Sequence, residues 1–145
     1  MKLHFFTVSI LLMSILSGIS AEFNARETFG LTPSRDLDAS LRQAQQKNKR
    51  VLLFFWDSKQ KGNYPGLEMK YFAELQETKK LLKDNFVVVL LDRNKSDAKK
   101  YYPSGNIEKA QWVLINSDGT AIKQDAVYGN PDVGLRTIKE LISIP

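Results

Sequence analysis

An unbroken apolar run from Val51 to Trp56, with Arg50 before it and Asp57 after it, is the feature that most constrains the fold of this chain. The run is far shorter than the roughly 20 residues that span a membrane. It consists only of β-branched, aliphatic and aromatic residues. Such a composition is typical of a strand buried on both faces, as in a parallel sheet covered by helices. We therefore expect an α/β sheet with this strand inside it.

The segment after this strand predicts a helix. Residues 65–84 have helical spacing, with a break expected near residues 73–76. Four residues are expected on the buried face of its first part: Leu67, Tyr71, Phe72 and Leu75. A buried strand whose carboxyl end leads into a helix is where open α/β sheets tend to place their chemistry. The junction from Asp57 to Tyr64 is therefore the first candidate site.

Two residue types are missing from the region that would fold. The chain contains no cysteine, and its one histidine, His4, lies in the N-terminal segment. Their absence removes thiol exchange, cysteine nucleophiles, Ser-His-Asp triads and the usual zinc sites. The loop from Asp92 to Asp97 resembles a calcium loop but lacks its central glycine and closing glutamate, and lysines crowd it. We expect neither a metal nor a cofactor.

Residues 1–20 have the pattern of a secretory signal peptide. A positively charged start leads into an apolar stretch that ends at Leu16, and the small residues Gly18 and Ser20 follow. Cleavage is expected after Ser20, with Ala21 as the alternative. An uncleaved anchor is the competing interpretation, but the apolar run is short. We expect an exported protein, periplasmic or secreted, with no stable membrane anchor after cleavage.

The net charge of +5 comes from lysines and arginines scattered along the chain. A nucleic-acid site would need them on one face with aromatic residues between them. The pattern favours a solvated surface with a mild positive bias, so no nucleic-acid partner is expected. Asn94 begins an N-glycosylation triplet, which matters only in a eukaryotic secretory pathway.

The rest of the chain predicts alternating helices and strands. We expect an extended lead-in over residues 21–36, followed by a single domain at 37–145. Asp36 or Asp38 is placed to cap the first helix of that domain. The expected elements are a helix at 37–48, strands at 51–57, 86–92 and 112–115, a tight turn at 116–119, an antiparallel strand at 120–124 and a helix at 132–143. This order predicts an α/β sandwich with one mixed sheet.

Several local segments resemble the thioredoxin-like superfamily in its exported form. The segment from Asn48 to Phe55 is similar to the opening strand of those domains, and Leu67–Glu68 followed by Phe72 is similar to the helix after the redox motif. Asn85 to Asp92 and Asn116 to Gly119 are similar to the next strand and to the hairpin turn, so that the likeness covers roughly residues 37–143. The resemblance implies a three-layer sandwich, with a central sheet of about four strands and helices on both faces.

The sequence departs from that family where its activity resides. The Cys-x-x-Cys positions fall on Lys61 to Tyr64, the cis-proline position falls on Ala110, and the buried acid falls on Phe54. A non-proline cis bond costs about 3 kcal/mol, so we expect a trans peptide before Ala110. Lys61 places a cation where the helix dipole disfavours one. The resemblance therefore implies a divergent, redox-inactive member that does not exchange disulfides.

The favoured function is a module that binds a protein or peptide through the former substrate-docking end of the fold. The residues expected to form this surface are Trp56, Lys61, Asn63, Tyr64, Lys109, Ala110 and Gln111. A second hypothesis gathers five aromatic residues there as interface anchors: Trp56, Tyr64, Tyr101, Tyr102 and Trp112. In the competing interpretation the two tryptophans lie in the core and the tyrosines cover the sheet edge.

Two other classes of function remain open at this point. One is an enzyme with non-thiol acid/base chemistry at Asp57, Lys61 and Tyr64, which would need a closed pocket to shift a pKa. The other is a structural subunit of an envelope assembly, which an exposed apolar patch would favour.

Overall fold

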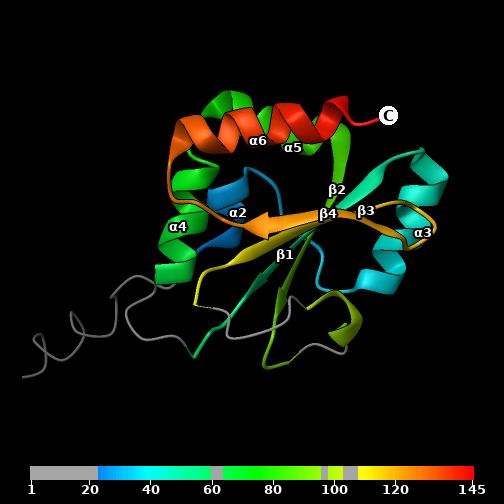
Figure 1. The fold of residues 1–145 in the computed structure, drawn as a ribbon, viewed down its shortest axis with the longest axis horizontal. Coiled ribbons are helices and arrows are strands. Elements are labelled where there is room, and N and C mark those ends of the chain that lie inside the picture. Colours follow the sequence, from blue (N-terminus) through cyan, green and yellow to red (C-terminus); the bar gives the residue numbers. More distant parts are fainter. Residues whose placement is uncertain (1–22, 60–63, 96–97, 103–107) are drawn as a thin grey trace, which may run out of the picture.

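The computed structural model describes residues 23–59, 64–95, 98–102 and 108–145 (Figure 1). The signal peptide expected at residues 1–20 lies outside the described residues. The elements are α2 (Ala25–Phe29), α3 (Leu37–Lys47), β1 (Arg50–Trp56), α4 (Tyr64–Phe72), α5 (Gln76–Asn85), β2 (Phe86–Asp92), the 3-10 turn η2 (Lys99–Tyr101), β3 (Gln111–Ile115), β4 (Ala121–Ala126) and α6 (Pro131–Ser143).

The four strands form one mixed sheet in the order β2-β1-β3-β4. β1 runs parallel to β2 and antiparallel to β3, and β4 is antiparallel to β3. Every residue from Val51 to Phe55 is fully buried. The expectation from the apolar run is confirmed: β1 is an inner strand covered on both faces.

Successive side chains of β1 enter two different core layers, as strand geometry requires. Leu52 and Phe54 pack with residues of α2, α4, α5 and α6 on one face. Val51, Leu53 and Phe55 pack on the other face with residues of α3 and η2. Figure 1 places α5 and α6 together on one side of the sheet, away from α3. The molecule is thus an α/β sandwich of three layers, as expected.

Local signals set the ends of the helices that cover the sheet. The Asp36 carboxylate accepts a hydrogen bond from the Ala39 N–H at 3.0 Å and caps α3, which makes Asp36 rather than Asp38 the cap. The break expected near residues 73–76 is present, because α4 ends at Phe72 and α5 begins at Gln76. The peptide before Ala110 is trans, since no described residue has a cis bond.

The buried face expected for α4 is wrong in part. Phe72 is buried, but Leu67 and Tyr71 are 43% and 41% exposed, and Pro65, Gly66 and Met69 face the core instead. Leu75 is not in α4; it precedes α5 as its N-cap. This short helix carries two apolar stripes, and close backbone packing decides between them. Gly66 of α4 lies against the Phe23 ring. The C-terminal end of α4, at Phe72, meets α6 at Gly134.

The lead-in at residues 21–36 is not wholly extended, because Ala25–Phe29 forms the helix α2. The Asn24 side chain accepts from the Glu27 N–H at its start, and Gly30, at φ 69°, ends it in the left-handed conformation. Phe29 is fully buried, with its ring centroid 4.8 Å from that of Phe54. This segment is therefore part of the folded core rather than an appendage to it.

Candidate functional site

The carboxyl ends of β1 and β2 meet in a polar network centred on Asp92. Asp92 as a whole is only 7% exposed. Its carboxylate accepts from the Ser58 hydroxyl, from the Ser58 N–H at 3.4 Å, and from the Asn94 N–H and side-chain amide at 3.1 and 3.0 Å. Burial by itself would raise the pKa of Asp92, but these hydrogen bonds outweigh it and hold the pKa below its ordinary value. Asp92 therefore fixes the loop as a stable carboxylate.

In the same network, Asp57 and the neighbouring Ser58 bind different partners rather than each other. Asp57 accepts from the Lys59 N–H at 2.9 Å and from the Asn94 side-chain amide. The Ser58 hydroxyl donates to Asp92, whose lowered pKa makes it a poor proton acceptor. These bonds give the loop its shape, and they hold the end of β1 against the end of β2.

Lys109, in the loop before β3, reaches across to α4. Its Nζ lies 2.8 Å from the Glu68 carboxylate and 5.8 Å from the centroid of the Tyr128 ring. The hydrogen bond and charge of Glu68 raise the pKa of Lys109. Gly129 lies against the Glu68 backbone, where a Cβ would come within 3.3 Å. The loop before β3, the helix α4 and the segment of Tyr128 and Gly129 therefore contact one another here.

The other expected site residues occupy different environments. Trp56 is half-buried, and its ring centroid lies 5.1 Å from that of Phe23. Its indole N–H has no acceptor among the described residues. Ala110 is fully buried and offers no side-chain surface; its carbonyl accepts from the Val127 N–H at 2.7 Å. Gln111 is the half-buried first residue of β3. Lys61 and Asn63 lie outside the described residues.

The five aromatic residues expected to gather at this end do not form one patch. Trp112 and Tyr101 are both buried, but they belong to the core layers on opposite faces of the sheet. The Tyr101 hydroxyl donates to the Gly119 carbonyl at 2.6 Å, and the Tyr102 hydroxyl donates to the Arg93 carbonyl at 3.0 Å. The interpretation that placed the tryptophans in the core is correct for Trp112.

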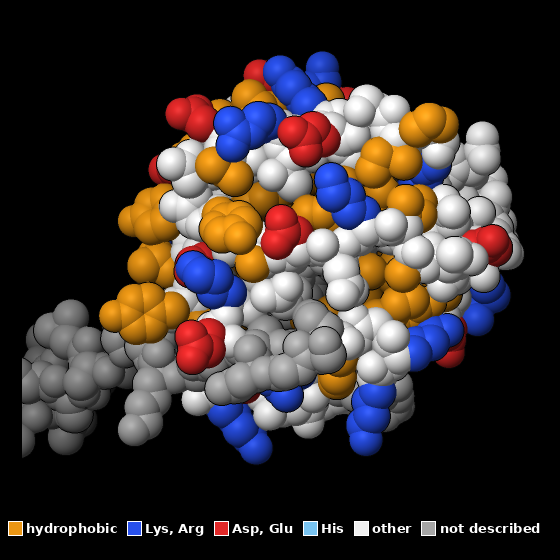
Figure 2. Space-filling model, viewed as in Figure 1, with side chains coloured by type: hydrophobic (Ala, Val, Ile, Leu, Met, Phe, Trp, Pro, Cys, Tyr) orange, Lys and Arg blue, Asp and Glu red, His pale blue; other side chains and the backbone are white. Residues whose placement is uncertain are grey.

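Exposed apolar side chains lie instead along one face of α4. Tyr64, Leu67 and Tyr71, which we name the α4 stripe, are 68%, 43% and 41% exposed. Tyr128, whose ring lies below the Lys109 ammonium, is 46% exposed. Figure 2 shows hydrophobic side chains along the left edge of the molecule, where α4 lies in Figure 1. Helical spacing identified Leu67 and Tyr71 in the sequence but assigned them to the core, whereas Tyr64 was expected at the binding surface.

Within the described ranges, no three acidic, histidine or cysteine side chains gather in the way that a metal ion requires. No helix among these residues has the length and apolar character needed to cross a membrane. Tyr64 stands largely in solvent, so its phenol is not enclosed in the kind of pocket that acid/base chemistry would need.

Comparison with known proteins identifies the fold. No family model and no curated protein matches the sequence. Among solved structures, the chain is similar to the DsbH oxidoreductase, with a TM-score of 0.60, 13% identity and coverage of 87% of this chain and 94% of that one. It is also similar to a thioredoxin from Thermus thermophilus, with a TM-score of 0.60, 15% identity and coverage of 75% and 85%.

A third solved structure agrees with these two. The C-terminal domain of Neisseria meningitidis DsbD, in its oxidised form, aligns with a TM-score of 0.55 at 15% identity and covers 75% of this chain and 98% of that domain. The chain therefore has the thioredoxin-like fold. It carries no cysteine, so it lacks the Cys-x-x-Cys motif and the thiols that disulfide exchange uses.

Proposed function

We propose that this chain is an exported, redox-inactive thioredoxin-like domain that binds a protein or peptide partner. The observation that carries the proposal is the α4 stripe. It exposes two tyrosines and a leucine to solvent on a helix whose opposite face is buried in the core. Large amphipathic rings are common anchors of protein interfaces. The leader-like residues 1–20 support export to the periplasm or the outside of the cell.

The ordered backbone beneath the α4 stripe favours a binding role over chance exposure of these apolar residues. Beneath it, Met69 and Phe72 are buried, and Glu68 on the same helix is held by Lys109. A surface whose backbone is already ordered loses less conformational entropy when it binds. The fold is thus suited to presenting these side chains, and the missing thiols point to binding rather than to disulfide exchange as the reason the fold is used.

Site-specific photocrosslinking tests the proposal. A photoreactive phenylalanine analogue replaces Tyr71 in the stripe or, as a matched control, Ile142, which is 37% exposed on α6. The protein is expressed in its native compartment and irradiated. The proposal expects a discrete adduct from position 71 and none from position 142, and a Leu67→Asp substitution should abolish it. Equal adducts from both positions, or none from position 71, would refute the assignment of this surface.

Affinity measurement then gives the size of the effect. Truncating an anchoring tyrosine at an interface costs on the order of 2 kcal/mol, or about 30-fold in affinity. Tyr64→Ala and Tyr71→Ala should each weaken binding to the crosslinked partner by roughly that factor, while Ile142→Ala leaves it unchanged. If neither tyrosine variant weakens binding, the α4 stripe is not the docking surface.

A further inference from the structure

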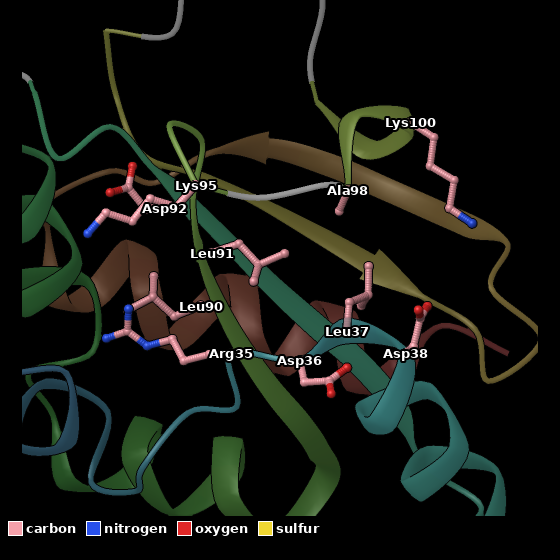
Figure 3. A pocket seen from close by; sticks show the side chains of 10 residues that line it. All are labelled: Arg35, Asp36, Leu37, Asp38, Leu90, Leu91, Asp92, Lys95, Ala98 and Lys100. Atoms are coloured by element: carbon pink, nitrogen blue, oxygen red, sulfur yellow. The ribbon is translucent and has the colours of Figure 1, made fainter.

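The two outer strands of the sheet, β2 and β4, present different edges. The β2 edge is partly occupied, because Ser34 donates to the Val88 carbonyl and accepts from the Leu90 N–H, both at 2.9 Å. Beside it lies a cavity of about 750 Å³ that cations and carboxylates line alike (Figure 3). Its mixed charge selects no ligand, so the β4 edge is the better candidate for an interaction.

Among the described strands, β4 borders β3 alone. In Figure 1, β4 crosses the front of the molecule, and no described helix lies over it. Lys123, Gln124 and Asp125 at its centre are all exposed. A sheet edge with unused backbone donors and acceptors is a template for another strand. None of these residues belongs to the α4 stripe, so a partner here would be additional to the one proposed for that stripe.

The ladder with β3 determines which backbone groups of β4 point outward. The Val127 N–H donates to the Ala110 carbonyl at 2.7 Å, one residue beyond the β3–β4 register, so these two residues form a hydrogen-bonded pair. Such pairs alternate along an antiparallel ladder. The backbone groups of Asp125 therefore face β3, whereas those of Gln124 and Ala126 face outward. The Ala126 N–H agrees, since it donates to the Asp125 carboxylate at 2.7 Å instead of to β3.

We propose that β4 pairs antiparallel with β4 of a second copy of this chain, across a twofold axis at Gln124. Each Gln124 donates its N–H to the Gln124 carbonyl of the other copy and accepts one in return. Lys123 of each copy then lies opposite Asp125 of the other. These are non-hydrogen-bonded pairs, in which side chains come closest. Opposite charges that face each other across two strands stabilise the pairing.

Charge also excludes the neighbouring registers. Outward-facing residues pair only with outward-facing residues, so the next possible axes lie at Lys123 and at Asp125. Each of these registers places a charge directly opposite its own copy, which is destabilising. A lysine on an edge strand normally discourages pairing, but here Asp125 lies two residues away on the same face and answers it. On pairing, Asp125 exchanges its bond with the Ala126 N–H for the lysine of the second copy.

Sedimentation equilibrium tests the pairing by charge exchange. A strand this short buries less than the roughly 1,200 Å² of a standard interface, so a reversible dimer with a Kd between about 1 μM and 1 mM is expected. Lys123→Glu and Asp125→Lys each place like charges opposite one another, and each should weaken dimerisation at least tenfold. The double variant should restore it, and an equimolar mixture of the two single variants should form heterodimers.

The matched control is Arg136→Glu, which makes the same charge change as Lys123→Glu at an exposed position on α6 and should alter dimerisation by less than twofold. Circular dichroism checks that each variant is folded. A chain that stays monomeric at about 1 mM, single variants that dimerise as the parent does, or a double variant that does not recover would each overturn the proposal.

Disulfide trapping tests the register separately. The chain contains no cysteine, so a single introduced thiol reports on its own position. Opposite residues of a hydrogen-bonded pair have Cα atoms about 5.5 Å apart, which a disulfide can bridge. Gln124→Cys should therefore oxidise to a linked dimer far more readily than the exposed control Arg136→Cys. Equal yields from both variants, or a Gln124→Cys adduct with another protein in place of a second copy, would contradict this pairing.

Discussion

Gly134 marks a very close contact between α6 and the end of α4 and provides a quantitative test of the packing. A Cβ on this residue of α6 would lie 1.8 Å from the Phe72 carbonyl oxygen and 2.7 Å from its carbon, at the end of α4. Real Cβ atoms essentially never come within 3.0 Å of another heavy atom of this kind. Gly134→Ala must therefore move the two backbones apart by about 1 Å or more.

The free-energy change follows from two opposing terms. Alanine favours the helix over glycine by about 1 kcal/mol. Against this, a separation of 0.5–1 Å forfeits roughly a quarter to a half of each van der Waals contact across the interface, and overpacking typically costs about 1–3 kcal/mol or more. Because the obstacle is backbone rather than a movable side chain, we expect a net loss near 2 kcal/mol.

Urea denaturation followed by circular dichroism measures this loss. The matched control is Arg136→Ala, an exposed position on the same helix, which should change the free energy of unfolding by less than about 0.5 kcal/mol. Gly66→Ala should give a smaller loss, because the atoms nearest to the Cβ there belong to the Phe23 side chain, at 3.1 Å, and not to backbone. If Gly134→Ala leaves stability unchanged or raises it, the helix-crossing argument is wrong.

Three further predictions concern Arg50 at the start of β1, the buried carboxylate of Asp92 and Phe29 in the lead-in. Arg50 donates to the Ile144 and Pro145 carbonyls at 2.7 and 2.6 Å, so Arg50→Ala should lower the free energy of unfolding by about 1–3 kcal/mol in urea titrations, and Arg50→Lys should restore only part of it. A full rescue by lysine would argue against the forked geometry. Because the pKa of Asp92 is lower in the folded state than its ordinary value of 3.8, the unfolded chain binds more protons in acid. The stability that Asp92 contributes is present above pH 3.8 and is lost as the pH falls toward the lower folded pKa, so Asp92→Asn should flatten the acid limb of the stability profile; an unchanged limb would contradict the assignment. Phe29→Ala should lower the free energy of unfolding by about 3–5 kcal/mol, because its ring is fully buried. A loss below about 1 kcal/mol would show that the lead-in is not part of the core.

Much of the fold was accessible from the sequence, because its signals there are local and strong. The continuous, β-branched and aliphatic runs of β1 and β2 strongly favour buried strands. Asp36 stands immediately before a helical pattern and caps it through a contact three residues away. The residues between Phe72 and Gln76 interrupt helical spacing where the chain does break. Elements of this kind are determined by neighbours in the chain.

What the sequence did not reveal depends on contacts between distant segments. The short helix α4 offers two apolar stripes, and only the approach of α6 and Phe23 decides which one is buried. α2 has five residues, too few for a period, and depends on its caps at Asn24 and Gly30. Lys109 and Glu68 are 41 positions apart, so their pairing follows from the sheet and not from any motif.

The two ends of the described chain leave the domain at opposite ends of its central strand. Phe23 packs beside Trp56, the last residue of β1, and Pro145 is held by Arg50, the first. A seven-residue strand separates them by roughly 20 Å. A tether placed ahead of Phe23 would start beside α4, the helix that carries the α4 stripe, because Phe23 packs against Gly66 there. A tether after Pro145 would leave this surface facing outward, which makes the C-terminus the place to immobilise or label the protein for binding measurements.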